Sequence, residues 1–147
     1  MSILDSRAIQ EILPHRYPFL LVDKIIEIEP RVRIVGIKQV TFNEYFFQGH
    51  FPNNPVFPGV FQIEAMAQTG GILVLNTVPD PENYWTYLLG IESCRFRKMV
   101  LPGDTIIFKC ELLAPIKRGF AKMQGQAFVA GNLVCEAVMS ASIVRKK

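Results

Sequence analysis

Residues 58–76 read PGVFQIEAMAQTGGILVLN, an apolar segment of helical length that carries a single carboxylate, Glu64. Its large apolar residues, such as Phe61 and Met66, are spread around the whole circumference of a helix. A helix that is apolar on all sides needs cover on all sides. The segment approaches membrane-spanning length, but a carboxylate at mid-span is costly in a bilayer. We therefore expect a buried helix of a soluble protein.

The segments on both sides of this helix have the character of strands. Before it, residues 19–29 and 32–41 are rich in β-branched and apolar residues, and Pro30 between them predicts a turn. They indicate an antiparallel hairpin in which Gly36 marks a possible bulge. Upstream, Ser6 is expected to cap a short helix that runs to about Leu13.

After the central helix, four more strands are predicted, with turns at Pro102-Gly103, Arg118-Gly119 and Gly131-Asn132. They cover residues 86–98, 104–118, 119–131 and 132–145. The order of elements does not alternate between strand and helix, so a doubly wound parallel sheet is not expected. The chain, residues 1–147, is predicted to be a single α+β domain in which a curved antiparallel sheet wraps around one long central helix.

Composition excludes several classes of function. The three cysteines, Cys94, Cys110 and Cys135, lie far apart without metal-ligand spacing, which argues against a disulfide framework or a zinc site. We expect them to be small buried residues of a protein in the reducing cytoplasm. The N-terminal segment shows no signal-peptide pattern. We expect no metal, no organic cofactor and no membrane association.

The formal net charge is +3, which is mild. Arg95, Arg97 and Lys98 form the most compact basic cluster, but no nucleic-acid motif accompanies them. They indicate a local acidic partner, or else ordinary solvated charges.

The loop before the central helix, FFQGHFPNNPVFPG, holds His50 among prolines that fix its backbone. A single loop histidine is more often structural than catalytic, but rigid surroundings suit a catalytic base. Pro58 suits the first helical turn and places the N–H of Gly59 near the helix N-terminus, where it can stabilise an oxyanion. The other histidine, His15, has no such context and is expected to be structural.

Glu64 and Gln68 are four residues apart, so they share one face of the helix. Gln68 can fix the side chain of Glu64 by a hydrogen bond, and burial would raise the pKa of Glu64. The alternatives for Glu64 are an exposed stripe or a salt bridge at a subunit interface. A base, an oxyanion donor and an acid suit the elimination of water next to a thioester or ketone carbonyl, without a cofactor.

Three stretches, HRYPFLLVDKI, FFQGHFPNNPVFPGVFQIEAMAQ and GIESCRFRKMVLPGD, closely resemble the 3-hydroxyacyl-[acyl-carrier-protein] dehydratases of the FabZ type. The resemblance covers essentially the whole chain and implies the hot-dog fold. It assigns the base to His50, the acid or water-orienting group to Glu64 of the partner subunit, the thioester carbonyl contact to Gly59 and support of Glu64 to Gln68. The site then lies at a dimer interface, and such dimers commonly form a trimer of dimers, a hexamer.

The resemblance further implies that the partner is an acyl carrier protein bearing a 3-hydroxyacyl-phosphopantetheine. Arg95, Arg97 and Lys98 are the expected docking residues. The expected walls of the acyl tunnel are Phe51, Val56 and Phe61. Some family members are fused to a lipid A deacetylase, and the sequence does not decide whether this chain is.

Two features bear on the subclass. A related dehydratase–isomerase family has Asp at the position of Glu64, so Glu64 favours the plain dehydratase. The Asn53-Asn54 pair differs from the glycine-containing loop usual in the family, which leaves the local geometry beside His50 open. Two other functions stay open, a hot-dog acyl thioesterase and a non-catalytic acyl-binding module.

Overall fold

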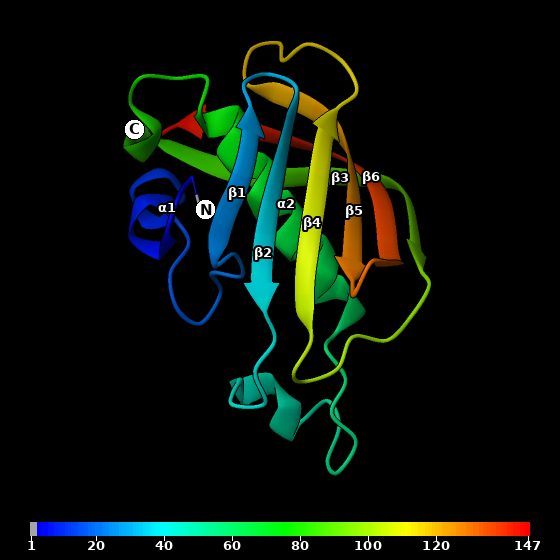
Figure 1. Ribbon diagram of the computed structural model, residues 1–147. Helices are drawn as coiled ribbons and strands as arrows, with labels where there is room; N and C mark the ends of the chain where they lie inside the picture. Colours follow the sequence, from blue (N-terminus) through cyan, green and yellow to red (C-terminus); the bar gives the residue numbers. More distant parts are fainter. Residues whose placement is uncertain (1–2) are drawn as a thin grey trace.

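In the computed structural model, which describes residues 3–147, the strands form one antiparallel sheet (Figure 1). Across those residues the sheet has six strands in the order β1-β2-β4-β5-β6-β3. The strands are β1 (Lys24–Glu29), β2 (Arg33–Gln39), β3 (Tyr84–Phe96), β4 (Thr105–Leu112), β5 (Phe120–Val129) and β6 (Asn132–Arg145). The helices are α1 (Ser6–Ile12), α2 (Gly59–Leu75) and the short 3-10 helices η1 (Tyr45–Gln48) and η2 (Pro81–Asn83).

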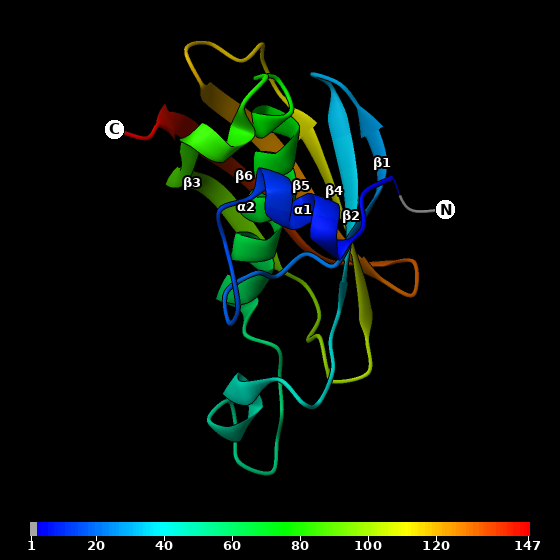
Figure 2. The ribbon, with the colours of Figure 1, turned by 90° about the vertical axis from the view of Figure 1, so that its left-hand side faces the viewer.

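The sheet curves around α2, which lies against its inner face (Figures 1 and 2). Residues from every turn of α2 are buried, because the sheet covers one side of the helix and α1 lies beside it. The core joins α2 residues such as Met66 and Ile72 to strand residues such as Phe108 and Met123. This is the hot-dog arrangement, and the predicted fold class is confirmed.

Glycine allows α2 to lie close to the sheet. A Cβ at Gly70 would stand 2.1 Å from the sulfur of Met123 on β5. A Cβ at Gly36 on β2 would stand 2.9 Å from Cγ2 of Thr69. Close approach of a strand thus explains the mid-helix glycine at position 70. The prediction that Gly36 marks a bulge is wrong, because the register shift lies in β1 between Ile25 and Glu27.

Two predicted boundaries at the N-terminal end are also wrong. Asp5 and not Ser6 caps α1, because the Asp5 carboxylate accepts hydrogen bonds from the N–H groups of Arg7 and Ala8. The strand predicted over residues 19–29 begins only at Lys24. Residues 19–21 bond instead to the side chain of Gln68, which takes the place of a neighbouring strand.

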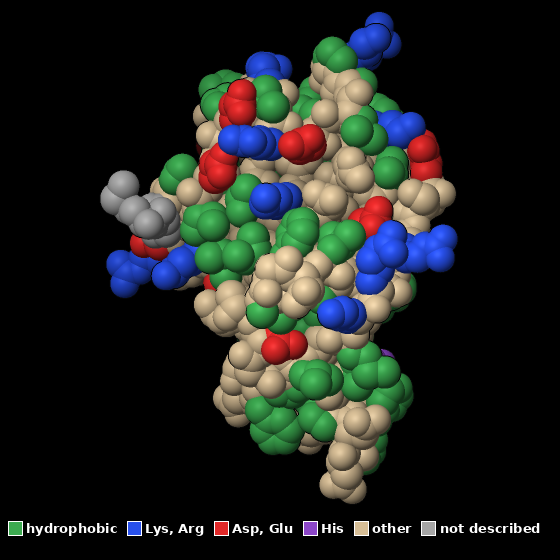
Figure 3. All heavy atoms as spheres, turned by 45° about the vertical axis from the view of Figure 1, so that its right-hand side comes forward, with side chains coloured by type: hydrophobic (Ala, Val, Ile, Leu, Met, Phe, Trp, Pro, Cys, Tyr) green, Lys and Arg blue, Asp and Glu red, His purple; other side chains and the backbone are tan. Residues whose placement is uncertain are grey.

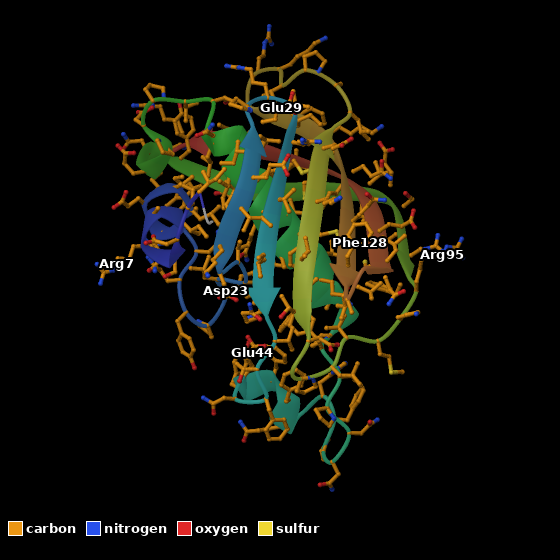
Figure 4. The ribbon with its side chains drawn as sticks, viewed as in Figure 1. Arg7, Asp23, Glu29, Glu44, Arg95 and Phe128 are labelled. Carbon is orange, nitrogen blue, oxygen red and sulfur yellow. The ribbon has the colours of Figure 1, made fainter. Side chains whose placement is uncertain are left out.

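The loop between β2 and α2 projects beyond the end of the sheet, at the bottom of Figure 1. A buried ion pair between Lys38 and Glu44 fixes the start of this loop, where Figure 4 labels Glu44. Figure 3 shows hydrophobic side chains gathered on the projection, and exposed Phe42 and Phe51 belong to it.

The cysteines follow the prediction in part. Cys110 and Cys135 are buried, and burial raises the pKa of each thiol to about 12. Cys94 is exposed on β3, so the expectation of a buried residue is wrong there. Within residues 3–147 no helix has the length and apolar character needed to cross a membrane.

Candidate active site

His50 lies where the projecting loop turns back toward α2, and its backbone is tied down on both sides. The N–H of His50 donates to the carbonyl of Phe46 at 3.0 Å, and the N–H of Val56 donates to the carbonyl of His50 at 2.9 Å. The ring stacks on Phe51 with centroids 4.1 Å apart. The loop thus holds the imidazole in one orientation.

The Nδ1 atom of His50 lies 2.6 Å from the carbonyl oxygen of Val56. A carbonyl oxygen only accepts hydrogen bonds, so a neutral imidazole in this position carries its proton on Nδ1. Nε2 then holds the free lone pair. This is the tautomer that a general base requires.

The backbone conformation of the loop shows how the Asn53-Asn54 pair fits beside His50. Asn53 adopts φ = 62°, the left-handed conformation that glycine favours and asparagine tolerates. Phe51 and Asn54 exchange two backbone hydrogen bonds of 2.9 and 2.8 Å across the turn. Asn53 therefore serves the turn in place of a glycine, and the ring of His50 stays anchored to Val56.

Gly59 opens α2 directly beside this loop. The sequence suggested that Pro58 lies in the first turn, but Pro58 is the N-cap of α2. No side chain caps the helix. The first N–H groups of a helix have no intrahelical partner and carry partial positive charge. A Cβ at Gly59 would stand 2.8 Å from the ring of Phe96, so only glycine keeps this approach open.

His50 and Gly59 line one cavity of about 480 Å³, a size that accommodates small ligands. Its walls come from the loop, the start of α2 and the end of β3. The remaining lining residues are Val56, Phe57, Pro58, Val60, Gln62, Phe96, Arg97, Lys98 and Met99. The structure therefore brings together His50, Gly59, Val56, Arg97 and Lys98, as the sequence predicted.

Glu64 lies about 1.4 turns further along α2, about 7.5 Å along the axis and about 140° around it from Gly59. Its side chain is 22% exposed. Burial raises the pKa of Glu64, and the hydrogen bond from Gln68 opposes that rise. No Lys or Arg of the described chain forms an ion pair with it, and the alternative of a salt bridge at a subunit interface stays a prediction.

Gln68 holds Glu64 as predicted, because its Nε2 donates to Glu64 Oε1 at 3.0 Å. The same Nε2 donates to the carbonyl of Phe19 at 2.7 Å, and its Oε1 accepts from the N–H of Leu21 at 2.8 Å. The amide is thus fully bonded and buried. It joins Glu64, α2 and the segment that carries His15.

Among residues 3–147, the cavity that His50 and Gly59 line does not include Glu64. Glu64 faces a second, small cavity of about 40 Å³ between α2 and the strands β3 and β6. Its walls include His15, Gln68 and Tyr87 but neither His50 nor Gly59. The described part of one chain therefore places His50 and Gly59 at one cavity and Glu64 at another.

Other predicted site residues lie elsewhere. Phe61 packs edge to face against Phe46, with centroids 5.0 Å apart, in an aromatic cluster against the core. Phe51 lines a hollow on the outer side of the projecting loop. Arg95 projects from the outer edge of the sheet in Figure 4 and is not among the residues that line the His50 cavity.

Sequence reasoning did not single out Phe96, Met99 or Val60, which form apolar walls of the His50 cavity. Nor did it place His15 next to Glu64, 3.7 Å from Nε2 to Oε1. No local signal marks either contact, because residues distant in the chain meet only after α2 packs on the sheet. Among the described residues, no group of three or more His, Cys, Asp or Glu side chains forms a candidate metal site.

Known proteins that are similar to this chain include FabZ dehydratases. The family model for the FabA-like domain matches residues 13–138. A 3-hydroxyacyl-[acyl-carrier-protein] dehydratase FabZ of Solibacter usitatus is 53% identical over 147 residues, which are 100% of this chain and 90% of that protein. A bifunctional LpxC/FabZ enzyme of Bacteroides thetaiotaomicron is 59% identical over 145 residues, 99% of this chain. The chain spans only 31% of the length of that enzyme.

Among solved structures, a chain of the dehydratase heterocomplex ApeI:P from Xenorhabdus doucetiae aligns with a TM-score of 0.80. Its identity is 19%, and the match covers 94% of this chain and 91% of that one. This likeness supports the fold. The family match and the FabZ relatives confirm the resemblance seen in the sequence, and the chain belongs to the FabA-like domain family.

Proposed function

We propose that this chain dehydrates (3R)-3-hydroxyacyl-[acyl-carrier-protein] to trans-2-enoyl-[acyl-carrier-protein] and water. The observation that carries the proposal is the Nδ1 contact of His50 with Val56, which leaves Nε2 free to accept a proton beside the N-terminus of α2. Relatives at about half identity over most of their own length carry the FabZ dehydratase name.

In the proposed reaction His50 Nε2 takes a proton from C2 of the substrate. Negative charge then develops on the thioester carbonyl, and the N–H of Gly59 at the helix N-terminus stabilises it. The double bond forms between C2 and C3 as the C3–oxygen bond breaks. The leaving hydroxyl takes a proton from Glu64, directly or through water, and departs as water.

Glu64 is proposed to serve the His50 of a second subunit. Two observations support this: the two side chains line different cavities of one chain, and burial raises the pKa of Glu64, so that a proton is held closer to neutral pH. A carboxyl group that keeps its proton can act as a general acid. The complete site would then consist of His50 and Gly59 from one subunit and Glu64 from the other.

Strand β3 offers the edge for such a dimer. It is the last strand of the sheet, next to β6 alone, so its outer edge is unpaired among residues 3–147. A long exposed edge strand with apolar side chains is a surface for pairing with another strand. Its exposed apolar residues are Trp85, Tyr87, Leu88, Leu89, Ile91 and Phe96. We propose pairing of two β3 strands, and further assembly to a hexamer as three dimers.

Carrier-protein docking is proposed at the mouth of the His50 cavity. Arg97 and Lys98 line this mouth and are exposed. Arg97 also binds Glu136 at 2.7 Å, which fixes its guanidinium beside the cavity. Arg95 would widen the basic surface along β3. The acyl chain would run along Val56 and the apolar walls, with Phe51 and Phe61 as further candidates in the assembled dimer.

The proposal also names the product of the reaction and the compartment in which the chain acts. Glu64, rather than Asp, favours dehydration without isomerisation to a 3-enoyl product. The chain is proposed to act in the cytoplasm as one hot-dog domain of residues 1–147, alone or within a longer enzyme.

One assay separates the candidates. The chain is mixed with a trans-2-enoyl thioester of a carrier protein, and enoyl absorbance and free thiol are followed together. The proposal predicts loss of enoyl absorbance with formation of the 3-hydroxyacyl product and no thiol release. Thiol release without hydration would instead identify a thioesterase, and tight binding without turnover an acyl-binding module.

A further inference from the structure

His15 is held against the side chain of Glu64, although nothing in the sequence pointed to this contact. Its Nε2 lies 3.7 Å from Glu64 Oε1, and its side chain is only 17% exposed. The distance is longer than a hydrogen bond, which spans about 2.7 to 3.2 Å. A rotation of the terminal torsion of Glu64, which is broad for carboxylates, can bring an oxygen into bonding range.

The backbone around His15 is fixed from two directions. Arg16 Nη1 donates to the carbonyls of Leu13 and His15 at 2.8 and 2.7 Å. Beyond it, Gln68 bonds the carbonyl of Phe19 and the N–H of Leu21. The ring of His15 also stacks on Phe19, with centroids 6.4 Å apart. The same amide that holds Glu64 therefore holds the segment that presents His15 to it.

The surroundings of His15 indicate which of its ring nitrogens carries the proton. Burial, and next the charge of Arg16, lower the pKa of His15, so the ring is neutral near pH 7. Nδ1 is buried and has no hydrogen-bond partner among residues 3–147. An unpaired buried acceptor is tolerated better than an unpaired buried donor. The neutral ring therefore carries its proton on Nε2, the atom that faces Glu64.

We infer that His15 is a positioning residue for Glu64. His15 donates from its Nε2 to Oε1 of Glu64, alongside the amide of Gln68. Two donors on Oε1 leave Oε2 to carry the acidic proton of the carboxyl group. When that proton passes to the leaving hydroxyl, the same two donors stabilise the carboxylate that remains. The inference rests on the proposed role of Glu64 as acid.

The other groups around this contact do not supply the same function. Of the residues that line the Glu64 cavity, the titratable ones are His15, Glu64 and, from β3, Tyr87. Strand β6 contributes Ala141, Ser142 and Ile143, none of which titrates. Arg16 acts on the ring by its charge but bonds backbone carbonyls. His15 is thus the one imidazole on this cavity wall in the described chain.

Two substitutions of His15 separate the effect of its hydrogen-bond donor from the effect of its ring shape. His15→Phe keeps an aromatic ring that can stack on Phe19 but removes the donor. His15→Gln places an amide N–H near the position of Nε2 without a titratable ring. We expect His15→Phe to lower kcat about 10-fold or more with KM within about 2-fold. We expect His15→Gln to recover most of that loss.

The pH profile gives a readout that a purely structural role would not move. Without a donor the carboxylate is less stable, so in the dehydration direction, where Glu64 must be protonated, the alkaline limb of kcat that reports Glu64 moves to higher pH in His15→Phe. It returns toward the parent position in His15→Gln. Full kcat with an unmoved limb in His15→Phe would overturn the inference, as would equal damage by both variants with the limb unmoved.

The carboxyl carbon of Glu64, followed by NMR in chain labelled at glutamate, reports the same shift without turnover. A higher Glu64 pKa in His15→Phe supports the inference, and an unchanged pKa overturns it, even if the activity of that variant is low. The activity of Glu64→Gln keeps the two claims apart. If Glu64→Gln is fully active, the proposed acid fails; if it is inactive while His15→Phe is normal, only the role of His15 fails.

Discussion

The ring of His50 donates from Nδ1 to the carbonyl oxygen of Val56 over 2.6 Å, while the N–H of Val56 bonds the carbonyl of His50 at 2.9 Å. This reciprocal pair fixes both the tautomer and the direction of the imidazole. It connects an otherwise irregular loop to the chemistry proposed for the site. A base that is already oriented loses little entropy when substrate binds.

His50→Ala is expected to lower the rate of enoyl-thioester hydration by about 10²- to 10⁴-fold, the usual contribution of a general base. The fold should persist, because the ring is only partly buried and most loop bonds are made by backbone. Gln48→Ala, an exposed change in the same loop, is the matched control and should keep the parent rate. A His50→Ala protein with full activity would exclude His50 as the base.

Glu64→Gln is expected to lose most activity but to gain stability at neutral pH. Burial raises the pKa of Glu64 in the folded chain, so the folded state binds more protons than the unfolded chain between the two pKa values. Stability therefore falls as pH rises from the unfolded pKa through the folded one, and Gln removes this loss. Thermal unfolding should show a Tm gain of a few degrees at pH ~8 and none at pH ~4.

The outcome that contradicts this prediction is a Tm difference of the same size at both pH values. That result would mean that ionisation of the buried Glu64 does not change the stability of the folded chain. Gln10→Ala, an exposed change on α1, serves as the reference for surface effects.

Gly70→Ala and Gly71→Ala form a matched pair on α2. Ala gains about 1 kcal/mol of helix propensity at either position. At Gly70 the new methyl would overlap Met123 at 2.1 Å, and overpacking costs about 1 to 3 kcal/mol. At Gly71 the nearest atoms, on Leu13 and Thr86, stand 3.8 and 3.9 Å away. Denaturant unfolding should show Gly70→Ala destabilised and Gly71→Ala neutral or stabilised; the reverse order would contradict this packing.

Charge reversal at the cavity mouth tests carrier-protein docking. Arg97→Glu with Lys98→Glu should raise KM for carrier-bound substrate about 10-fold at low salt, with less effect at high salt because salt screens exposed charges. The same charge change in Lys117→Glu with Arg118→Glu, on the β4–β5 loop, is the control. Equal KM increases from both pairs would show that only net charge matters.

The sequence predicted the layers of this fold better than the details of its site. The apolar circumference of residues 58–76 required cover on all sides, and the predicted strands before and after it supplied a sheet for one of them. The pairing of Gln68 with Glu64 followed from their spacing of four residues along a helix. The base candidate and Gly59 followed from a rigid loop that leads directly into that helix.

What the sequence missed depends on contacts between distant segments. Gln68 bonds residues 47 and 49 positions away, which ended the predicted strand early. Phe96 reached Gly59 only through the curvature of β3, and His15 reached Glu64 only through the packing of its segment on α2. Spacing in sequence carries no information on such meetings.

The central claim is that each site takes His50 from one subunit and Glu64 from the other, and mixing two inactive variants tests it most directly. His50→Ala and Glu64→Gln proteins are unfolded together in equal amounts, refolded and assayed for hydration. Half of the dimers should then be mixed, and each mixed dimer should hold one intact site, which gives about a quarter of the parent activity. If the mixture stays as inactive as its two components while mixed dimers are detected by mass, the shared site is contradicted.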